Sequence, residues 1–192
     1  MNRNASRRPI LAFLALLMML PGAAPPAAAA VRCDAADFVQ RASDAYDHAA
    51  QTGSPVAFAN AAARFSDLQA LSLFALGRYR KDLPKSREAE YFTLTRNFIG
   101  RFMLKNGGGF KTSNLTIISC MSSSTGMIVT ARLSNGDRVV FQIAGSGGSY
   151  RVVDLSMHGI WLAQQMRSTF VGTITNYGGS IEAMFVYVRG RQ

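Results

Sequence analysis

The stretch that decides the fold runs from Tyr150 to Tyr187 and reads YRVVDLSMHGIWLAQQMRSTFVGTITNYGGSIEAMFVY. Apolar and polar side chains alternate from Val153 to His158. A period of two places alternate side chains on opposite faces of a strand. The sequence therefore predicts a strand with an apolar face, formed by Val153, Leu155 and Met157, and a polar outer face.

Gly159 interrupts this alternation, and a helical period follows it. The apolar residues recur four positions apart, at Leu162, Met166, Phe170 and Ile174. This spacing predicts a helix with one apolar stripe. Gly178 and Gly179 stand where a helix C-cap is expected, and Ser180 can cap a second, short helix.

The first half of the chain is predicted to be helical. Helical spacing is found over residues 34–51 and 68–76, and a weaker, alanine-rich signal covers residues 56–64. A broader apolar stripe starts at Tyr91 and continues through Leu94, Phe98 and Phe102. Stripes of this kind indicate helices that pack against a core.

After Phe110 the period changes to two. Strands are predicted over residues 115–120, 127–133 and 139–143, and Asn135-Gly136 is a typical hairpin turn. Together with the strand at Tyr150 they predict a four-stranded antiparallel meander, because the connections are too short for parallel crossovers. Helices followed by such a sheet and two more helices predict the α+β class.

The stretch around Tyr150–Tyr187 also resembles the MlaC family, the toluene-tolerance family of periplasmic phospholipid-binding proteins. An upstream segment, Leu76-Gly77-Arg78-Tyr79, matches the same family pattern. The residues that carry the resemblance over the later stretch are Arg151-Val152-Val153-Asp154, Gly159, Gln165, Arg167-Ser168, Phe170, Asn176, Gly178-Gly179 and Glu182-Ala183.

The resemblance implies a nuclear-transport-factor-like cone, in which helices close over a curved sheet around an apolar cavity. It also implies a carrier of phospholipid acyl chains. The partners implied are an outer-membrane lipoprotein complex and an inner-membrane ABC transporter with its substrate-binding-domain protein. Exchange of lipid with these partners would maintain outer-membrane lipid asymmetry. A hopanoid or other isoprenoid is the alternative ligand. We expect the cavity to be lined by apolar residues of three predicted stripes: Phe98, Phe102, Met127, Val129, Phe141, Leu155, Leu162, Met166 and Phe170.

Two further interpretations stay open at this stage. A ligand-free exported interaction module would have the same apolar stripes around a solid core, since such stripes most often form ordinary cores. A cone-fold enzyme would have inward-facing Asp or His in place of apolar side chains. We expect a monomer in each case.

Residues 1–30 have the features of a cleaved signal peptide. Arg3, Arg7 and Arg8 precede an apolar run from Ile10 to Leu20, and Ala28-Ala29-Ala30 is a small-residue cleavage site. The apolar run is shorter than the roughly 20 residues that span a bilayer. We therefore expect export to the periplasm by the Sec route, or by the twin-arginine route that the arginine pair would also allow. Residues 31–192 would then form one domain.

The charge of the exported chain is positive. The first 30 residues contain three arginines and no acid, so the net charge of +10 becomes +7 after their removal. A basic surface suits anionic partners such as lipid headgroups or a membrane. The densest cluster of cations lies between Arg78 and Arg87. Nucleic acid is not expected, since no basic strand pattern with interleaved aromatics is found.

Cys33 and Cys120 are the two cysteines of the chain. Both would enter an oxidising compartment, which predicts one disulfide that closes a long loop. Two free buried thiols are the alternative.

No catalytic or metal site is predicted. Asp154, Ser156 and His158 could suggest a triad, but alternate residues of a strand are attached about 6.6 Å apart. A nucleophile and its base need about 2.6–3.2 Å between heavy atoms. His48 and His158 have no ligand-like spacing to the cysteines. We therefore expect neither an enzyme nor a bound cofactor.

Overall fold

The computed structural model describes residues 33–106 and 115–190. The predicted signal peptide lies outside the described residues. Within them, no helix combines the length and the apolar character that a bilayer-crossing segment needs.

The described residues form six α-helices, two 3-10 turns and one sheet. The first three helices are α1 (Ala36–Thr52), α2 (Pro55–Phe65) and α3 (Leu68–Ala75). The turns η1 (Gly77–Asp82) and η2 (Lys85–Arg87) lead into α4 (Glu88–Asn106). After the sheet come α5 (Leu162–Asn176) and α6 (Ile181–Arg189).

The early helices begin and end at residues with the expected capping chemistry. Gly53 adopts φ +62° after α1, a left-handed conformation that ends the helix. The Ser54 side chain accepts a hydrogen bond from the Ala57 amide, and Asp67 accepts one from Ala70 at 3.0 Å. These caps satisfy amides that have no partner within the helix.

The sheet is antiparallel and its strands follow the chain order. The strands are β1 (Thr116–Ser123), β2 (Gly126–Arg132), β3 (Arg138–Ala144), β4 (Arg151–Met157) and β5 (Ile160–Trp161). The predicted Asn135-Gly136 turn joins β2 to β3, and the Gly136 amide donates to the Leu133 carbonyl. The α+β class is confirmed.

The sheet has five strands rather than the predicted four, and it is not closed. His158 and Gly159 both adopt positive φ, at +52° and +78°. Two consecutive left-handed residues reverse the chain in a two-residue hairpin. Ile160 therefore pairs with Met157, and Trp161 with Ser156. This strand is two residues long, too short for an alternation of apolar and polar residues to reveal it in the sequence.

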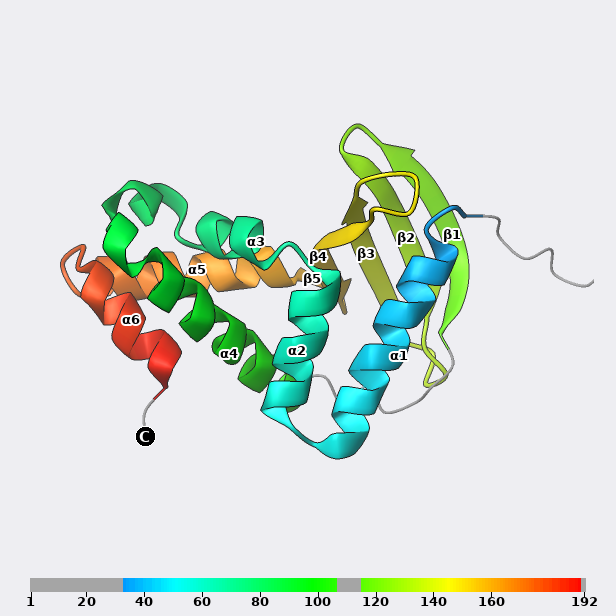
Figure 1. Cartoon of the computed structure of the whole chain (residues 1–192), viewed down its shortest axis with the longest axis horizontal. Coiled ribbons are helices and arrows are strands. Elements are labelled where there is room, and N and C mark those ends of the chain that lie inside the picture. The colour runs from blue at the N-terminus through cyan, green and yellow to red at the C-terminus, as the bar shows by residue number, and fades with distance from the viewer. Residues whose placement is uncertain (1–32, 107–114, 191–192) are drawn as a thin grey trace, which may run out of the picture.

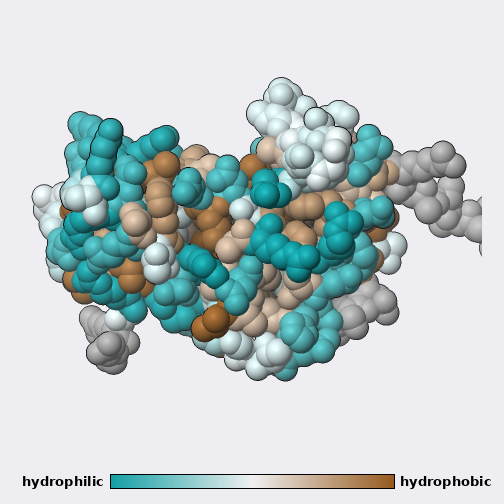
Figure 2. Space-filling model, in the orientation of Figure 1, coloured by the Kyte–Doolittle hydropathy of each residue, from teal (hydrophilic) through white to brown (hydrophobic). Residues whose placement is uncertain are grey.

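The elements form two groups (Figure 1). One consists of the sheet with α1 packed on it, and the other of α3, α4, α5 and α6; α2 lies between them. Hydrophobic side chains are visible in the hollow between the groups (Figure 2). Phe38 of α1 packs against Tyr150, just before β4, and against Phe65 of α2, with ring centroids 5.7 and 5.8 Å apart.

A β-bulge at Val153 changes which residues of β4 face the α1 side. Gln142 of β3 pairs with Asp154, but the next residue, Ile143, pairs with Val152, so that Val153 is extra. Val152 therefore replaces Val153 in the apolar face with Leu155. The predicted polar outer face is wrong: Asp154 and Ser156 are 9% and 3% exposed.

The predicted disulfide is present. Cys33, just before α1, is bonded to Cys120 of β1, and their Cα atoms are 5.8 Å apart. The bond closes a loop across 87 residues of sequence. It ties the start of α1 to the edge strand of the sheet.

Candidate functional site

A groove of about 1180 Å³ lies between α4, α5 and α6. It is open to solvent along one side. Half-buried and buried apolar side chains line its inner part, while polar groups and two cations lie nearer the rim. The residues that line it include Phe98, Arg101, Phe102, Lys105, Met166, Tyr177, Glu182, Val186 and Tyr187.

Aromatic rings form the inner wall of the groove. The Phe98 ring lies 5.4 Å from Phe170 and 5.8 Å from Tyr187, and it stacks on Phe102 at 6.3 Å between centroids. Met166, 1% exposed, lies on the α5 side. Rings at these separations attract one another in addition to their burial, so the wall is a preformed apolar surface.

A second space of about 210 Å³ adjoins the groove. It shares Phe102, Asn106 and Gln165 with the groove, and it extends to Met157 and Ile160 at the β4–β5 hairpin. Leu155 and Leu162 also line it. Apolar surface therefore continues from the helices to the end of the sheet.

A third space, of about 20 Å³, lies between the sheet and helices α1 to α5. It shares Met103, Leu155 and Leu162 with the second space. This volume holds about one water molecule. The enclosed cavity predicted against the sheet is therefore not confirmed, and the larger space is the open groove.

The structure places six of the nine predicted lipid-binding residues beside these three spaces. They are Phe98, Phe102, Phe141, Leu155, Leu162 and Met166. The other three lie elsewhere. Val129 and Phe170 are fully buried, and Met127 lies beside the disulfide, its Sδ 3.2 Å from Cys120 Sγ. Phe170 does not line the groove, but its ring packs against that of Phe98, which does.

Apart from Phe98, Phe102 and Met166, the residues that line the groove were not predicted; they include Arg101, Lys105, Tyr177, Val186 and Tyr187. The available signal was in α6, which is apolar on two sides. Met184, Phe185 and Val188 face inward with no exposed surface, yet Val186 and Tyr187 are also apolar and are exposed. A helix that is apolar outside its buried stripe has a second surface to cover.

An ionic network fixes α6 at the edge of the groove. Arg87 pairs with Glu90 at 2.9 Å and with Glu182, while Arg189 pairs with Glu90 and lies 3.7 Å from Glu182. Both arginines lie over the ring of Phe185. Hydrogen bonds from Arg189 and then Arg87 lower the pKa of Glu90. The network holds the start of α4 against α6.

The position of α5 depends on Asp154. Its Oδ1 accepts hydrogen bonds from the amides of Leu155 at 2.8 Å and Ala163 at 3.0 Å. The second bond satisfies a free amide in the first turn of α5. Burial raises the pKa of the Asp154 carboxyl, although these two amides oppose the effect.

The Leu76-Gly77-Arg78-Tyr79 segment holds the other end of α5. A Cβ on Gly77 would lie 2.8 Å from the side chain of Val171, and Gly77 also has φ +56°. Arg78 and the Tyr79 hydroxyl both reach Thr175 Oγ1, at 2.9 and 3.1 Å. Glycine is therefore required where η1 crosses α5.

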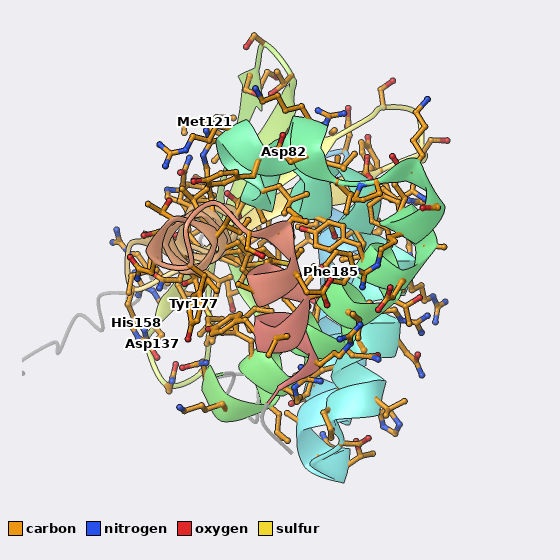
Figure 3. All side chains as sticks on the ribbon, turned by 90° about the vertical axis from the view of Figure 1, so that its left-hand side faces the viewer. Asp82, Met121, Asp137, His158, Tyr177 and Phe185 are labelled. Atoms are coloured by element: carbon orange, nitrogen blue, oxygen red, sulfur yellow. A yellow bond between two sulfur atoms is a disulfide. The ribbon has the colours of Figure 1, made fainter. Side chains whose placement is uncertain are left out.

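The structure does not bring the candidate triad together. Asp154 is bonded to backbone amides, and Ser156 is buried. His158 is exposed and its Nε2 lies 3.2 Å from Asp137 Oδ2 (Figure 3). Among the described side chains, no hydrogen bond links the three residues. Residues 33–106 and 115–190 contain no cluster of three His, Cys, Asp or Glu that could hold a metal ion.

The fold has a counterpart among solved structures. It is similar to the phospholipid-binding protein from Ralstonia solanacearum, solved in complex with a phospholipid at 1.53 Å, with a TM-score of 0.67 and 16% sequence identity. The match covers 81% of this chain and 95% of that one. No curated protein matches the sequence. The model of the MlaC protein family matches residues 39–187, and the chain belongs to this family.

Proposed function

We propose that this protein is a periplasmic carrier that holds phospholipid acyl chains in the groove between α4, α5 and α6. The observation that carries the proposal is the aromatic and aliphatic wall around Phe98, Phe102 and Met166, which continues to Leu155 and Leu162. Membership of the MlaC family and the fold shared with a phospholipid-binding protein support the same ligand class.

Such a carrier would bind acyl chains by removing them from water, and it would catalyse no reaction. Each buried CH₂ group contributes about 0.8 kcal/mol, so that two long acyl chains supply ample binding energy. The groove is open, so the headgroup would stay in contact with water. A carrier of this kind can accept several headgroups, because its affinity comes from the chains.

The adjoining space between α4 and the β4–β5 hairpin would receive the end of an acyl chain. Phe102 lines both this space and the groove, and it is half-buried. A rotation of its side chain would widen the connection. The inferred path runs from the solvent-exposed groove toward Leu155, without a preformed cavity under the sheet.

The carrier would exchange lipid with two membrane systems. We propose an outer-membrane lipoprotein complex on one side, and an inner-membrane ABC transporter with its substrate-binding-domain protein on the other. Exchange between them would maintain the lipid asymmetry of the outer membrane. Family membership supports these partners and the periplasmic location.

Mass spectrometry of lipid extracted from protein purified from bacteria tests the proposal. We expect about one phospholipid per chain in the unaltered protein, and Phe102→Asp should lose it because a charge in an apolar site is costly to desolvate. Leu104→Asp is the matched control: Leu104 is on the same helix, 40% exposed, and does not line the groove. Folded protein without lipid would contradict the proposal. Extraction of a hopanoid would show that the ligand is a hopanoid and not a phospholipid.

A further inference from the structure

We propose that the rim of the groove is a membrane-docking surface, through which the protein lies directly on a bilayer that contains anionic lipid. The surface consists of Arg101 and Lys105 of α4, Tyr177 at the end of α5, and Val186 and Tyr187 of α6. This inference rests on the proposed function, since it states how the groove would meet its lipid.

The apolar part of the docking surface is exposed although it belongs to ordered helices. Tyr177, Val186 and Tyr187 are 68%, 58% and 42% exposed, and all three line the groove. Tyr177 and Phe185 lie on opposite sides of α6 (Figure 3). The inward side of α6 is thus covered by the core, while its apolar outer side is left for another surface.

The charges of α6 do not interrupt this outer side. Its two charged residues are Glu182 and Arg189, and both take part in the network with Arg87 and Glu90. Among the described residues that line the groove, Glu182 is also the one acid. The negative charge nearest the docking surface is therefore already paired.

Two cations stand at the same rim. Arg101 and Lys105 are four residues apart, hence about one turn apart on α4, and both are exposed. Arg101 donates to the carbonyl of Val188, which fixes it against α6. Lys105 lies one turn further along. With a charge of +7 on the predicted exported chain, this rim complements an anionic surface.

This combination fits a bilayer rather than a protein. Tyrosine rings prefer the headgroup level, where one end is apolar and the other is wet, and basic side chains pair with lipid phosphates. A short apolar face beside them would lie at the acyl boundary. Because the groove opens at the same rim, an acyl chain could move from the bilayer to Phe98 and Phe102 with little exposure to water.

Vesicle flotation with the purified protein tests the docking surface. Vesicles of phosphatidylcholine with phosphatidylglycerol should bind the protein, and more salt should weaken this binding. Lys105→Gln should weaken it about fivefold, since one basic residue near an anionic membrane contributes about that factor. Lys85→Gln, which removes the same charge from η2 away from the groove, should have little effect.

The contribution of apolar side chains to vesicle binding is tested by a second pair of matched variants. Val186→Gln should reduce vesicle binding, whereas Val56→Gln should not, because Val56 is similarly exposed at 65% but lies at the start of α2. Thermal unfolding followed by circular dichroism verifies that each variant is folded. Equal binding by all four variants, or binding that is indifferent to phosphatidylglycerol, would overturn the docking surface. Self-association through Val186 in place of vesicle binding would also overturn it.

Lipid content, measured on the same samples, separates this inference from the proposed function. Weaker vesicle binding by Lys105→Gln than by Lys85→Gln supports the docking surface, whether or not the Lys105→Gln variant still carries lipid. Protein that carries lipid yet ignores every vesicle contradicts the docking surface alone. Protein that binds vesicles through this rim but never carries lipid contradicts the carrier function alone.

Discussion

The guanidinium of Arg87 lies 3.7 Å from the centroid of the Phe185 ring. Phe185 is fully buried on α6, whereas Arg87 belongs to η2, almost a hundred residues earlier in the chain. The arginine also pairs with Glu182 on the same helix. One side chain therefore anchors α6 both by a cation–π contact and by an ion pair.

Truncation of the Phe185 ring, which Arg87 contacts, should destabilise the fold. We expect Phe185→Ala to lower the free energy of unfolding by about 3–5 kcal/mol, since the ring is fully buried. Phe74→Ala is the control: Arg167 lies 4.9 Å from its ring centroid, but Phe74 is 38% exposed. Urea denaturation should show the smaller loss for Phe74. Equal losses would mean that burial does not decide the effect.

The ionic network should make stability sensitive to acid. The pKa of Glu90 is below its ordinary value near 4.5, because Arg189 and Arg87 donate to the charged carboxylate. The contribution of Glu90 to the stability of the fold is thus present above its pKa in the unfolded chain. It is lost as the pH falls through its lower pKa in the folded protein. Between about pH 6 and pH 3, the melting temperature of the Glu90→Gln variant should fall less than that of the unaltered protein. Identical losses in the two proteins would contradict this.

Two helical glycines should respond oppositely to the same change. A Cβ on Gly100 of α4 would lie 2.2 Å from the Pro55 carbonyl oxygen of α2, whereas a Cβ on Gly172 of α5 meets nothing within 4 Å. We expect Gly100→Ala to cost about 1–3 kcal/mol as overpacking. Gly172→Ala should be neutral, or stabilise by up to about 1 kcal/mol. Denaturant midpoints measure both, and a harmless Gly100→Ala would show that α2 and α4 can separate.

The carboxylate of Asp154 should matter as an acceptor rather than as a charge. Asp154→Ala removes the partner of the Ala163 amide, and the loss of such a cap typically costs about 0.5–2 kcal/mol. Asp154→Asn keeps one acceptor oxygen and avoids the burial of a charge, so that it should preserve most of the stability. Thermal unfolding compares the two, and equal destabilisation would assign the role to the charge.

The disulfide should stabilise the attachment of α1 to the sheet. We expect the double variant Cys33→Ser with Cys120→Ser to lose about 2–4 kcal/mol. Labelling of denatured, unreduced protein should find no free thiol, and a reductant should destabilise the unaltered protein but not the variant. Two labelled thiols per chain would contradict the bond in the purified protein.

The sequence alone was sufficient for the order of the α-helices and of the first four strands, and for the family. The helical stripes of α1, α3, α4 and α5 and the Asn135-Gly136 turn are local patterns, and each is set by residues within a few positions of one another. The pairing of Cys33 with Cys120 followed from their number and the expected export. The helical stripes and the turn depend hardly at all on how distant parts of the chain pack.

Only the tertiary structure decided that both sides of β4 are buried and where the large space lies. One extra residue, Val153, brings Val152 onto the face of Leu155, and no period of the sequence reveals such a bulge. α5 then covers Asp154, which had been predicted at the surface. The groove arises because α6 packs beside α4 and α5, so that Val186 and Tyr187 reach the same rim as Lys105. Apolar stripes determine which residues are buried, but the packing of helices determines where a space remains between them.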